Sequence, residues 1–140
     1  MSAFRIKIRR FKSHGKVYEY FIFKDLSENV RLLKLRCPRD IVVRMFSKVG
    51  SSGSWADTKF GRAMGLLVRD NTLFKKALIL ASIYDCTRRE IDINKVLETV
   101  GDLDDRVADY WYELIVRNYS PRTHHGICRV VAAFRTLYSL

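Results

Sequence analysis

Cysteine is scarce in this chain, and its three copies do not have the pattern of a disulfide framework. Cys37, Cys86 and Cys128 are odd in number and lie far apart. Small secreted domains that depend on disulfides carry an even number of cysteines at regular spacings. A chain of 140 residues is also long enough to bury a core without a disulfide or a metal ion. We therefore expect three free thiols, buried in the core.

Histidine is equally scarce, which limits the chemistry that the chain could perform. The three histidines are at positions 14, 124 and 125, and no Ser/His/Asp or Cys/His set is identifiable around them. His124, His125 and Cys128 suggest a zinc site, but tetrahedral zinc needs about four ligands and no fourth is apparent. Neither a P-loop motif nor GxGxxG occurs. The sequence predicts no catalytic residue, no metal and no cofactor, and so no enzyme.

Long hydrophobic runs are also missing. No apolar stretch approaches the roughly 20 residues that a membrane-spanning helix needs. The first residues lack the charged, apolar and cleavage regions of a signal peptide. We therefore expect a cytoplasmic protein with no membrane partner.

Acidic residues are few at the start of the chain, where basic residues are concentrated. Residues 1–50 hold 13 Lys or Arg and 4 Asp or Glu, whereas residues 101–140 hold five of each kind. The first 50 residues thus account for +9 of the +11 net charge. This asymmetry favours a polyanionic partner, nucleic acid first and an anionic membrane second. The alternative is that the charge serves solubility alone.

The stretch FRIKIRRFKSHGKVYEYFIFK near the N-terminus has the alternation of a β-hairpin. A four-residue loop over residues 13–16 pairs Ile8 with Phe21 and Ile6 with Phe23, so the apolar faces match. A slip of one residue would mix the two faces, and this disfavours other registers. The opposite face then carries Arg5, Lys7, Arg9, Tyr18, Tyr20 and Ile22.

A third strand is predicted from Val30 to Cys37, and a helix is predicted to begin at Pro38. Lys34 and Arg36 extend the basic face of the sheet, while the alternate residues of the strand join the core. The helix covers the apolar side of the sheet with a stripe of Ile41, Val42, Met45, Phe46 and Val49. A three-stranded antiparallel sheet covered in this way keeps one face free for a ligand.

Residues 50–54, GSSGS, have the composition of a flexible linker. We expect a β-β-β-α unit over residues 1–49 and a helical domain over residues 55–140. The expected helices are one with a stripe of Phe60, Met64, Leu67 and Val68, then residues 73–84, 94–100 and 103–118. A last helix capped by Ser120-Pro121 carries the stripe Ile127, Val130, Val131, Phe134 and Tyr138. The fold class is therefore α+β, a small antiparallel sheet with one helix followed by a helical bundle.

The basic sheet face has the chemistry of a nucleic-acid site. Lys and Arg contact phosphates, and Arg also recognises guanine edges in a major groove wide enough for a β-ribbon. Tyrosine stacks on exposed bases or packs against sugars. The alternative is an edge hairpin whose charges only prevent aggregation. The candidate residues are Arg5, Lys7, Arg9, Arg10, Lys16, Tyr18, Tyr20, Lys34 and Arg36.

Two helical segments are further candidates. Residues 91–118 have the order of a helix-turn-helix, but five carboxylates on the second helix would repel phosphate. We interpret its acidic start as charge placement at a helix N-terminus. The last helix has a basic polar face, and a helix N-terminus with Arg and a hydroxyl can hold phosphate, although an ordinary packing helix is the alternative. Its candidate residues are Arg122, Thr123, His124 and Arg129.

The stretch RVADYWYELIVRNYSPRTHHGICRVVAAFRTLYSL resembles the core-binding domain of tyrosine recombinases (phage-type integrases). The stretches RIKIRRFKSHGKVYEYFIFKD and VRLLKLRCPRDIVVRMFSKV are similar to the hairpin, third strand and helix that open some integrases of archaeal viruses. In that family the N-terminal sheet and the core-binding helices clamp DNA. The resemblance implies a sheet site with Arg5, Lys7, Arg9, Tyr18 and Tyr20, and a helical site with Arg122, Thr123, His124 and Arg129.

The resemblance does not extend to catalysis. In the family an Arg, His, Arg and Tyr set follows the core-binding domain, and this sequence ends where that domain should begin. Tyr138 lies near the end without a second group of arginines to stabilise a phosphotyrosine. The resemblance therefore implies a non-catalytic DNA-binding relative or a separated fragment.

The sequence thus predicts non-catalytic DNA binding, with double-stranded DNA favoured and single-stranded DNA left open. A helix-turn-helix regulator is one alternative. Another is a single-stranded nucleic-acid binder that uses Tyr18 and Tyr20 as stacking platforms. A third is a subunit whose basic face docks an acidic protein. The target sequence stays open, as does assembly into a homo-oligomer or a larger nucleoprotein complex.

Overall fold

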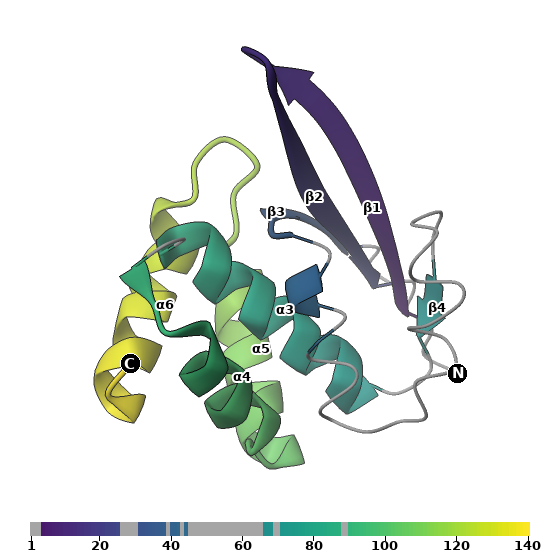
Figure 1. The fold of residues 1–140 in the computed structure, drawn as a ribbon. Coiled ribbons are helices and arrows are strands. Elements are labelled where there is room, and N and C mark those ends of the chain that lie inside the picture. Colours follow the sequence, from purple (N-terminus) through teal and green to yellow (C-terminus); the bar gives the residue numbers. More distant parts are fainter. Residues whose placement is uncertain are drawn as a thin grey trace.

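The computed structural model describes residues 4–25, 31–38, 40–42, 44, 66–68, 71–87 and 90–140. The fold is α+β, with an antiparallel sheet and a layer of helices (Figure 1). The strands are β1 (Phe4–Ser13), β2 (Lys16–Asp25), β3 (Arg31–Arg36) and β4 (Leu66–Val68). The helices are α3 (Asn71–Thr87), α4 (Ile93–Gly101), α5 (Asp105–Asn118) and α6 (His125–Tyr138).

The hairpin of β1 and β2 has the predicted register but a tighter turn. Ile6 lies opposite Phe23 and Ile8 opposite Phe21, as the matching of apolar faces requires. The loop has two residues instead of four, because Ser13 and Lys16 already pair. His14 and Gly15 both have positive φ, 50° and 76°. Positive φ at both turn residues is typical of a type I′ turn, whose twist matches that of the strands.

The sheet contains more strands than predicted, and in the described part of the chain their order is β3-β2-β1-β4. Leu67 and Val68, expected on a helical stripe, instead belong to β4 and pair with β1. A run of three apolar residues is too short to distinguish helix from strand by periodicity, so the prediction was wrong there. Phe60 and Met64 of the same stripe lie outside the described residues.

β3 and the segment after it follow the predicted pattern. Leu33, Leu35 and Cys37 are buried at 3% exposure or less, while Lys34 is exposed. Residues 40–42 and 44 are helical, in agreement with a helix after Pro38, and Ile41 and Val42 are buried. Met45, Phe46 and Val49 lie outside the described residues, as does the predicted linker over residues 50–54.

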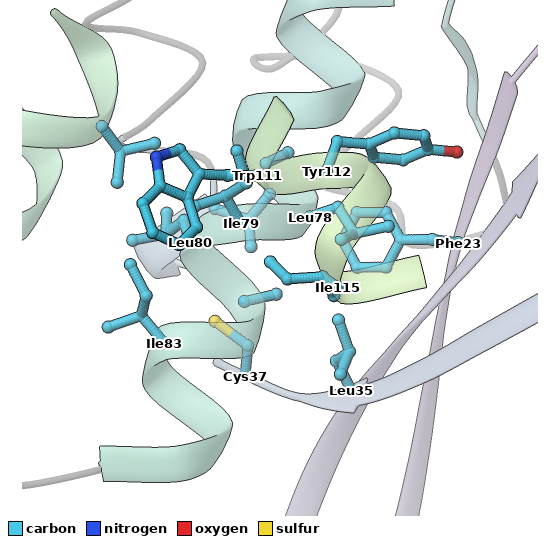
Figure 2. Close-up of a cluster of buried hydrophobic side chains, with 14 of the residues drawn as sticks. Phe23, Leu35, Cys37, Leu78, Ile79, Leu80, Ile83, Trp111, Tyr112 and Ile115 are labelled. Carbon is cyan, nitrogen blue, oxygen red and sulfur yellow. The ribbon is translucent and has the colours of Figure 1, made fainter. Parts of the chain in front are cut away.

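The sheet and the helices share one hydrophobic core, with α3 at its centre. The Phe23 ring lies 5.6 Å from the Phe74 ring of α3, and Phe74 lies 6.1 Å from Tyr112 of α5, measured between centroids. Figure 2 shows Phe23 and Leu35 of the sheet gathered with side chains of α3 and α5. The division at residues 50–54 stays a prediction, and the described parts on either side of it pack together.

The helices α4 and α5 begin at aspartate caps. The Asp92 carboxylate accepts hydrogen bonds from the Asn94 and Lys95 amides, and the Asp104 carboxylate accepts one from the Val107 amide. An N-cap aspartate satisfies amides that have no partner inside the helix. This geometry agrees with our interpretation of the acidic start of α5 as charge placement at a helix N-terminus.

The last helix begins four residues later than predicted. Ser120 and Thr123 form an isolated bridge, and the Ser120 hydroxyl accepts a hydrogen bond from the Arg122 amide. The Ser-Pro pair therefore starts a turn, and α6 begins only at His125. Its predicted stripe is confirmed, with Ile127, Val131 and Phe134 buried and Val130 and Tyr138 partly buried.

The expectation of three free thiols was wrong. Cys86, near the end of α3, forms a disulfide with Cys128 in α6, and their Cα atoms lie 5.4 Å apart. The two residues are 42 positions apart, so their spacing carries no sign of the contact that the packing of α3 and α6 creates. Cys37 alone is free and buried, as predicted.

No helix in the described part of the chain is both long and apolar enough to cross a membrane.

Candidate nucleic-acid interface

Most of the predicted sheet residues lie on one face, opposite the core. The strand pairing places Lys7 beside Ile22, Arg9 beside Tyr20 and Tyr20 beside Arg36, so alternate residues of three strands share this side. Figure 1 shows that α3 lies on the other side of the sheet. We call this surface the basic face and define it as Lys7, Arg9, Lys16, Tyr18, Tyr20, Lys24, Lys34 and Arg36.

The charged side chains of the basic face are accessible. Arg9, Lys16 and Lys34 are exposed, while the other five residues are partly exposed. Lys24 was missed by the sequence analysis, although it follows Ile22 at the same alternation and could have been found. For Arg5, the structure establishes only its strand position, opposite Lys24 and Leu67.

Each of the two tyrosines on the basic face has a basic side chain over its ring. The Arg36 guanidinium carbon lies 4.0 Å from the centroid of the Tyr18 ring, and the Lys34 ammonium lies 4.6 Å from the centroid of the Tyr20 ring. A cation over an aromatic ring is attracted by the negative charge of the ring face. Each ring therefore positions a cation, and one of its faces is occupied by that cation.

The outer part of the hairpin is a two-stranded ribbon. β3 pairs with β2 only over Tyr20–Asp25, and β4 pairs with β1 only over Phe4–Ile6. The ribbon beyond these partners projects past the helices in Figure 1. It carries cations on both sides, because Lys16 points to the basic face while Arg10 and Lys12 point to the opposite side.

Arg10 does not belong to the basic face. It lies on the other side of the ribbon, where its Nε donates to a Glu19 carboxylate oxygen at 3.0 Å. Both residues remain accessible, with side-chain exposures of 54% and 19%. An exposed ion pair of this kind contributes little to stability.

The loop between α5 and α6 is held against the edge of β3. The Lys34 backbone amide donates a hydrogen bond to the Tyr119 hydroxyl at 3.1 Å, across 85 residues of sequence. This bond satisfies an outward-facing amide of an edge strand, which would otherwise be open to pairing. It also brings the loop, with exposed Arg122 and Thr123, to the end of the sheet that carries Lys34 and Arg36.

The other end of the loop is held by α3. The His124 Nδ1 lies 2.9 Å from a carboxylate oxygen of Asp85, whose side chain is only 3% exposed. The disulfide of the neighbouring Cys86 joins the first turn of α6 to the same end of α3. A buried carboxylate needs such partners, because its removal from water is costly. Neither Asp85 nor Tyr119 was predicted, since no local pattern marks a contact across so many residues.

The four residues predicted for the helical site are divided between the loop and α6. Arg122, Thr123 and His124 lie in the loop or at the start of α6, but the Thr123 hydroxyl already accepts a hydrogen bond from the His125 amide. Arg129 is exposed one turn further along α6. Both the loop and the ribbon extend from the same side of the helical layer (Figure 1).

The second helix of the helix-turn-helix candidate keeps its acidic character in three dimensions. Trp111, Tyr112 and Ile115 are its buried side, whereas Asp105 and Asp109 are on its exposed side. One of these carboxylates, Asp109, is paired with Lys75 at 2.6 Å. Phosphate would meet this surface less favourably than the basic face.

Two of the three expected free thiols are joined in a disulfide, which changes what they can bind. Cys128 is bonded to Cys86 and so offers no thiolate to a metal beside His124 and His125. Within the residues that the structure describes, no three His, Cys, Asp or Glu side chains form a group suited to a metal ion. Burial raises the pKa of the Cys37 thiol well above its usual value, with smaller contributions from the Asp40, Asp85 and Glu19 charges. Cys37 is therefore a neutral core group.

Comparisons with protein-family models, with curated proteins and with solved structures find no match to the chain. Its function must therefore be argued from the arrangement of its own residues.

Replacing Tyr119 by phenylalanine tests the link between the loop and the sheet. The Lys34 amide would lose its acceptor, and we expect the free energy of unfolding to fall by about 1 kcal/mol. Amide hydrogen exchange measured by NMR should show faster exchange at Lys34. Tyr110→Phe is the matched control, because Tyr110 is 59% exposed on α5. Unchanged exchange at Lys34 would contradict the proposed link.

Proposed function

We propose that the protein binds double-stranded DNA, without catalysing a reaction on it, through the basic face and the loop between α5 and α6. One observation carries this proposal. Cations from three strands lie on a single accessible face, and the loop that carries Arg122 is held at its edge.

Phosphate contacts supply the main part of the expected affinity. Each Lys or Arg that neutralises a phosphate releases a counterion, which makes binding strong at low salt and weak at high salt. Arg36 and Lys34 are well suited to this role, because the tyrosine rings beneath them restrict their positions before DNA arrives. Less conformational freedom is then lost when the phosphate binds.

The ribbon supports a contact inside a groove. A two-stranded ribbon fits the major groove of B-DNA, where arginine can contact guanine edges with two hydrogen bonds. Cations on both sides of the ribbon would face the phosphates that line the groove. Arg9 is the candidate for base contact, since it is exposed on the part of β1 that reaches beyond β4.

The resemblance to the DNA-binding part of tyrosine recombinases points to the same two surfaces, the N-terminal sheet and the start of the last helix. We include in the proposal an integrase-like mode of clamping DNA between these surfaces. We also propose that the protein is located in the cytoplasm, where it would encounter this DNA.

The decisive test is a titration of labelled duplex DNA at several salt concentrations. Lys7→Glu and Arg9→Glu, made separately, should each weaken binding at least tenfold, because a favourable charge is replaced by a repulsive one. Each lost phosphate contact should also lower the slope of log affinity against log salt by about 1. Circular dichroism should show unchanged folding, since both side chains face away from the core.

Arg106→Glu is the matched control, with the same change in charge on the exposed side of α5. We expect it to weaken binding less than twofold. A larger effect at Arg106 than at Lys7 would instead favour the helix-turn-helix alternative. Wild-type affinity in both hairpin variants would remove the basic face from the site. If no nucleic acid binds the wild-type protein at any salt concentration, an acidic protein partner becomes the better explanation.

A further inference from the structure

A cavity of about 450 Å³ lies where β2 runs past the end of β3. Residues of β2, the end of β3 and the two residues after it line the cavity, together with Tyr84 of α3. Its volume is within the range of roughly 300–1,000 Å³ that is usual for ligand sites. Among the described residues, its chemically distinctive lining is Lys16, Tyr18, Glu19, Arg36, Pro38 and Tyr84.

We propose that this cavity holds one unpaired base of a bound nucleic acid. The inference rests on the proposed function, because Lys16, Tyr18 and Arg36 belong both to the basic face and to the cavity. A strand whose phosphates lie on the basic face would therefore have a neighbouring base at the cavity mouth.

The lining groups match the base and the phosphate of a nucleotide. The Tyr84 and Tyr18 rings and the Pro38 ring offer flat or apolar surfaces to a base, and base–aromatic stacking is tolerant of sequence. Lys16 and Arg36 offer charge to its phosphate. The Glu19 carboxylate can accept a hydrogen bond from a base amino or ring N–H group.

The same lining argues against a small anion as the occupant. A sulfate or free phosphate would use only Lys16 and Arg36 and would leave the Tyr18, Tyr84 and Pro38 rings uncovered. A base inside an intact duplex is stacked and paired, so it cannot enter the cavity without being extruded. The occupant is therefore a base from a single strand, an end or a distorted site.

Fluorescence of 2-aminopurine, placed in a single-stranded oligonucleotide, tests the proposal. Stacking in the cavity should quench this base in the wild-type complex. Tyr84→Ala should abolish the quenching and weaken single-strand binding about tenfold, while duplex affinity changes less than twofold. Tyr84→Phe keeps the ring and should restore both signals, which separates stacking from a loss of fold. Tyr110→Ala, on exposed α5, is the control and should leave both signals unchanged.

A free mononucleotide should displace the quenched oligonucleotide only at millimolar concentrations, because it lacks the neighbouring phosphates. Displacement at micromolar concentrations would overturn the assignment to a polymer.

Quenching and single-strand affinity at wild-type levels in a folded Tyr84→Ala protein would overturn the cavity proposal. Loss of duplex binding in Lys7→Glu would then still support the basic face, so the two proposals fail separately.

Discussion

Replacing Gly126 by alanine is expected to lower the free energy of unfolding by about 2 kcal/mol, although alanine is the better helix former. Gly126 lies in the first turn of α6, against the end of α5. An added Cβ would overlap the backbone carbonyl oxygen of Asn118, and the carbonyl carbon would be only 3.2 Å away. Backbone atoms cannot rotate aside as a side chain can, so the two helices would have to separate.

The sign of the change in the free energy of unfolding shows whether close packing or helix propensity dominates at Gly126. Overpacking typically costs about 1–3 kcal/mol, whereas glycine to alanine in a helix normally gains about 1 kcal/mol. Urea denaturation measures the balance. Ala133→Gly, at an exposed position of α6, is the control and should lose about 1 kcal/mol through propensity alone. A more stable Gly126→Ala protein would show that α5 and α6 do not approach as closely as described.

Removing the disulfide is expected to have the other large effect. Cys86→Ala with Cys128→Ala should lower the free energy of unfolding by about 2–4 kcal/mol, because the bond closes a long loop and restricts the unfolded chain. The two cysteines are 42 residues apart, which places the bond among those with a substantial entropic effect. Denaturation curves of oxidised and double-variant protein measure the difference.

The reduced wild-type protein provides the matched comparison. A reductant should destabilise the wild type by nearly the same amount and leave the double variant unchanged. Mass spectrometry under oxidising conditions should find the Cys86–Cys128 peptide pair and a free Cys37. A stability that does not respond to reductant would show that the bond is absent or without effect in solution.

The hairpin was the most predictable part of the fold. Its alternation places Ile6 opposite Phe23 and Ile8 opposite Phe21, and Ile6, Phe21 and Phe23 are buried. The same alternation assigns the basic face, because residues between the apolar positions must point the other way. The length of the turn was harder to predict. Pairing extends as far as Ser13 and Lys16, because His14 and Gly15 between them both adopt positive φ.

The start of α6 shows why local signals can mislead. Hydroxyl residues cap helices and also close turns, by the same hydrogen bond in which a nearby amide donates to the side-chain oxygen. Ser120 uses that bond in a turn with Arg122, and the helix begins afterwards. Tyr119, just before this turn, accepts the hydrogen bond of the Lys34 amide, and Arg122 within the turn is exposed.

The sequence by itself determined the basic face, the buried stripes of the helices and the acidic start of α5. These features depend on the period of a strand or a helix, or on contacts between residues a few positions apart. Only the tertiary structure decided the disulfide, the Asp85–His124 pair, the Tyr119 link and the cavity beside Tyr84. Each of these joins groups from elements far apart in the chain, and their distances are set by how α3 packs against the sheet and α6.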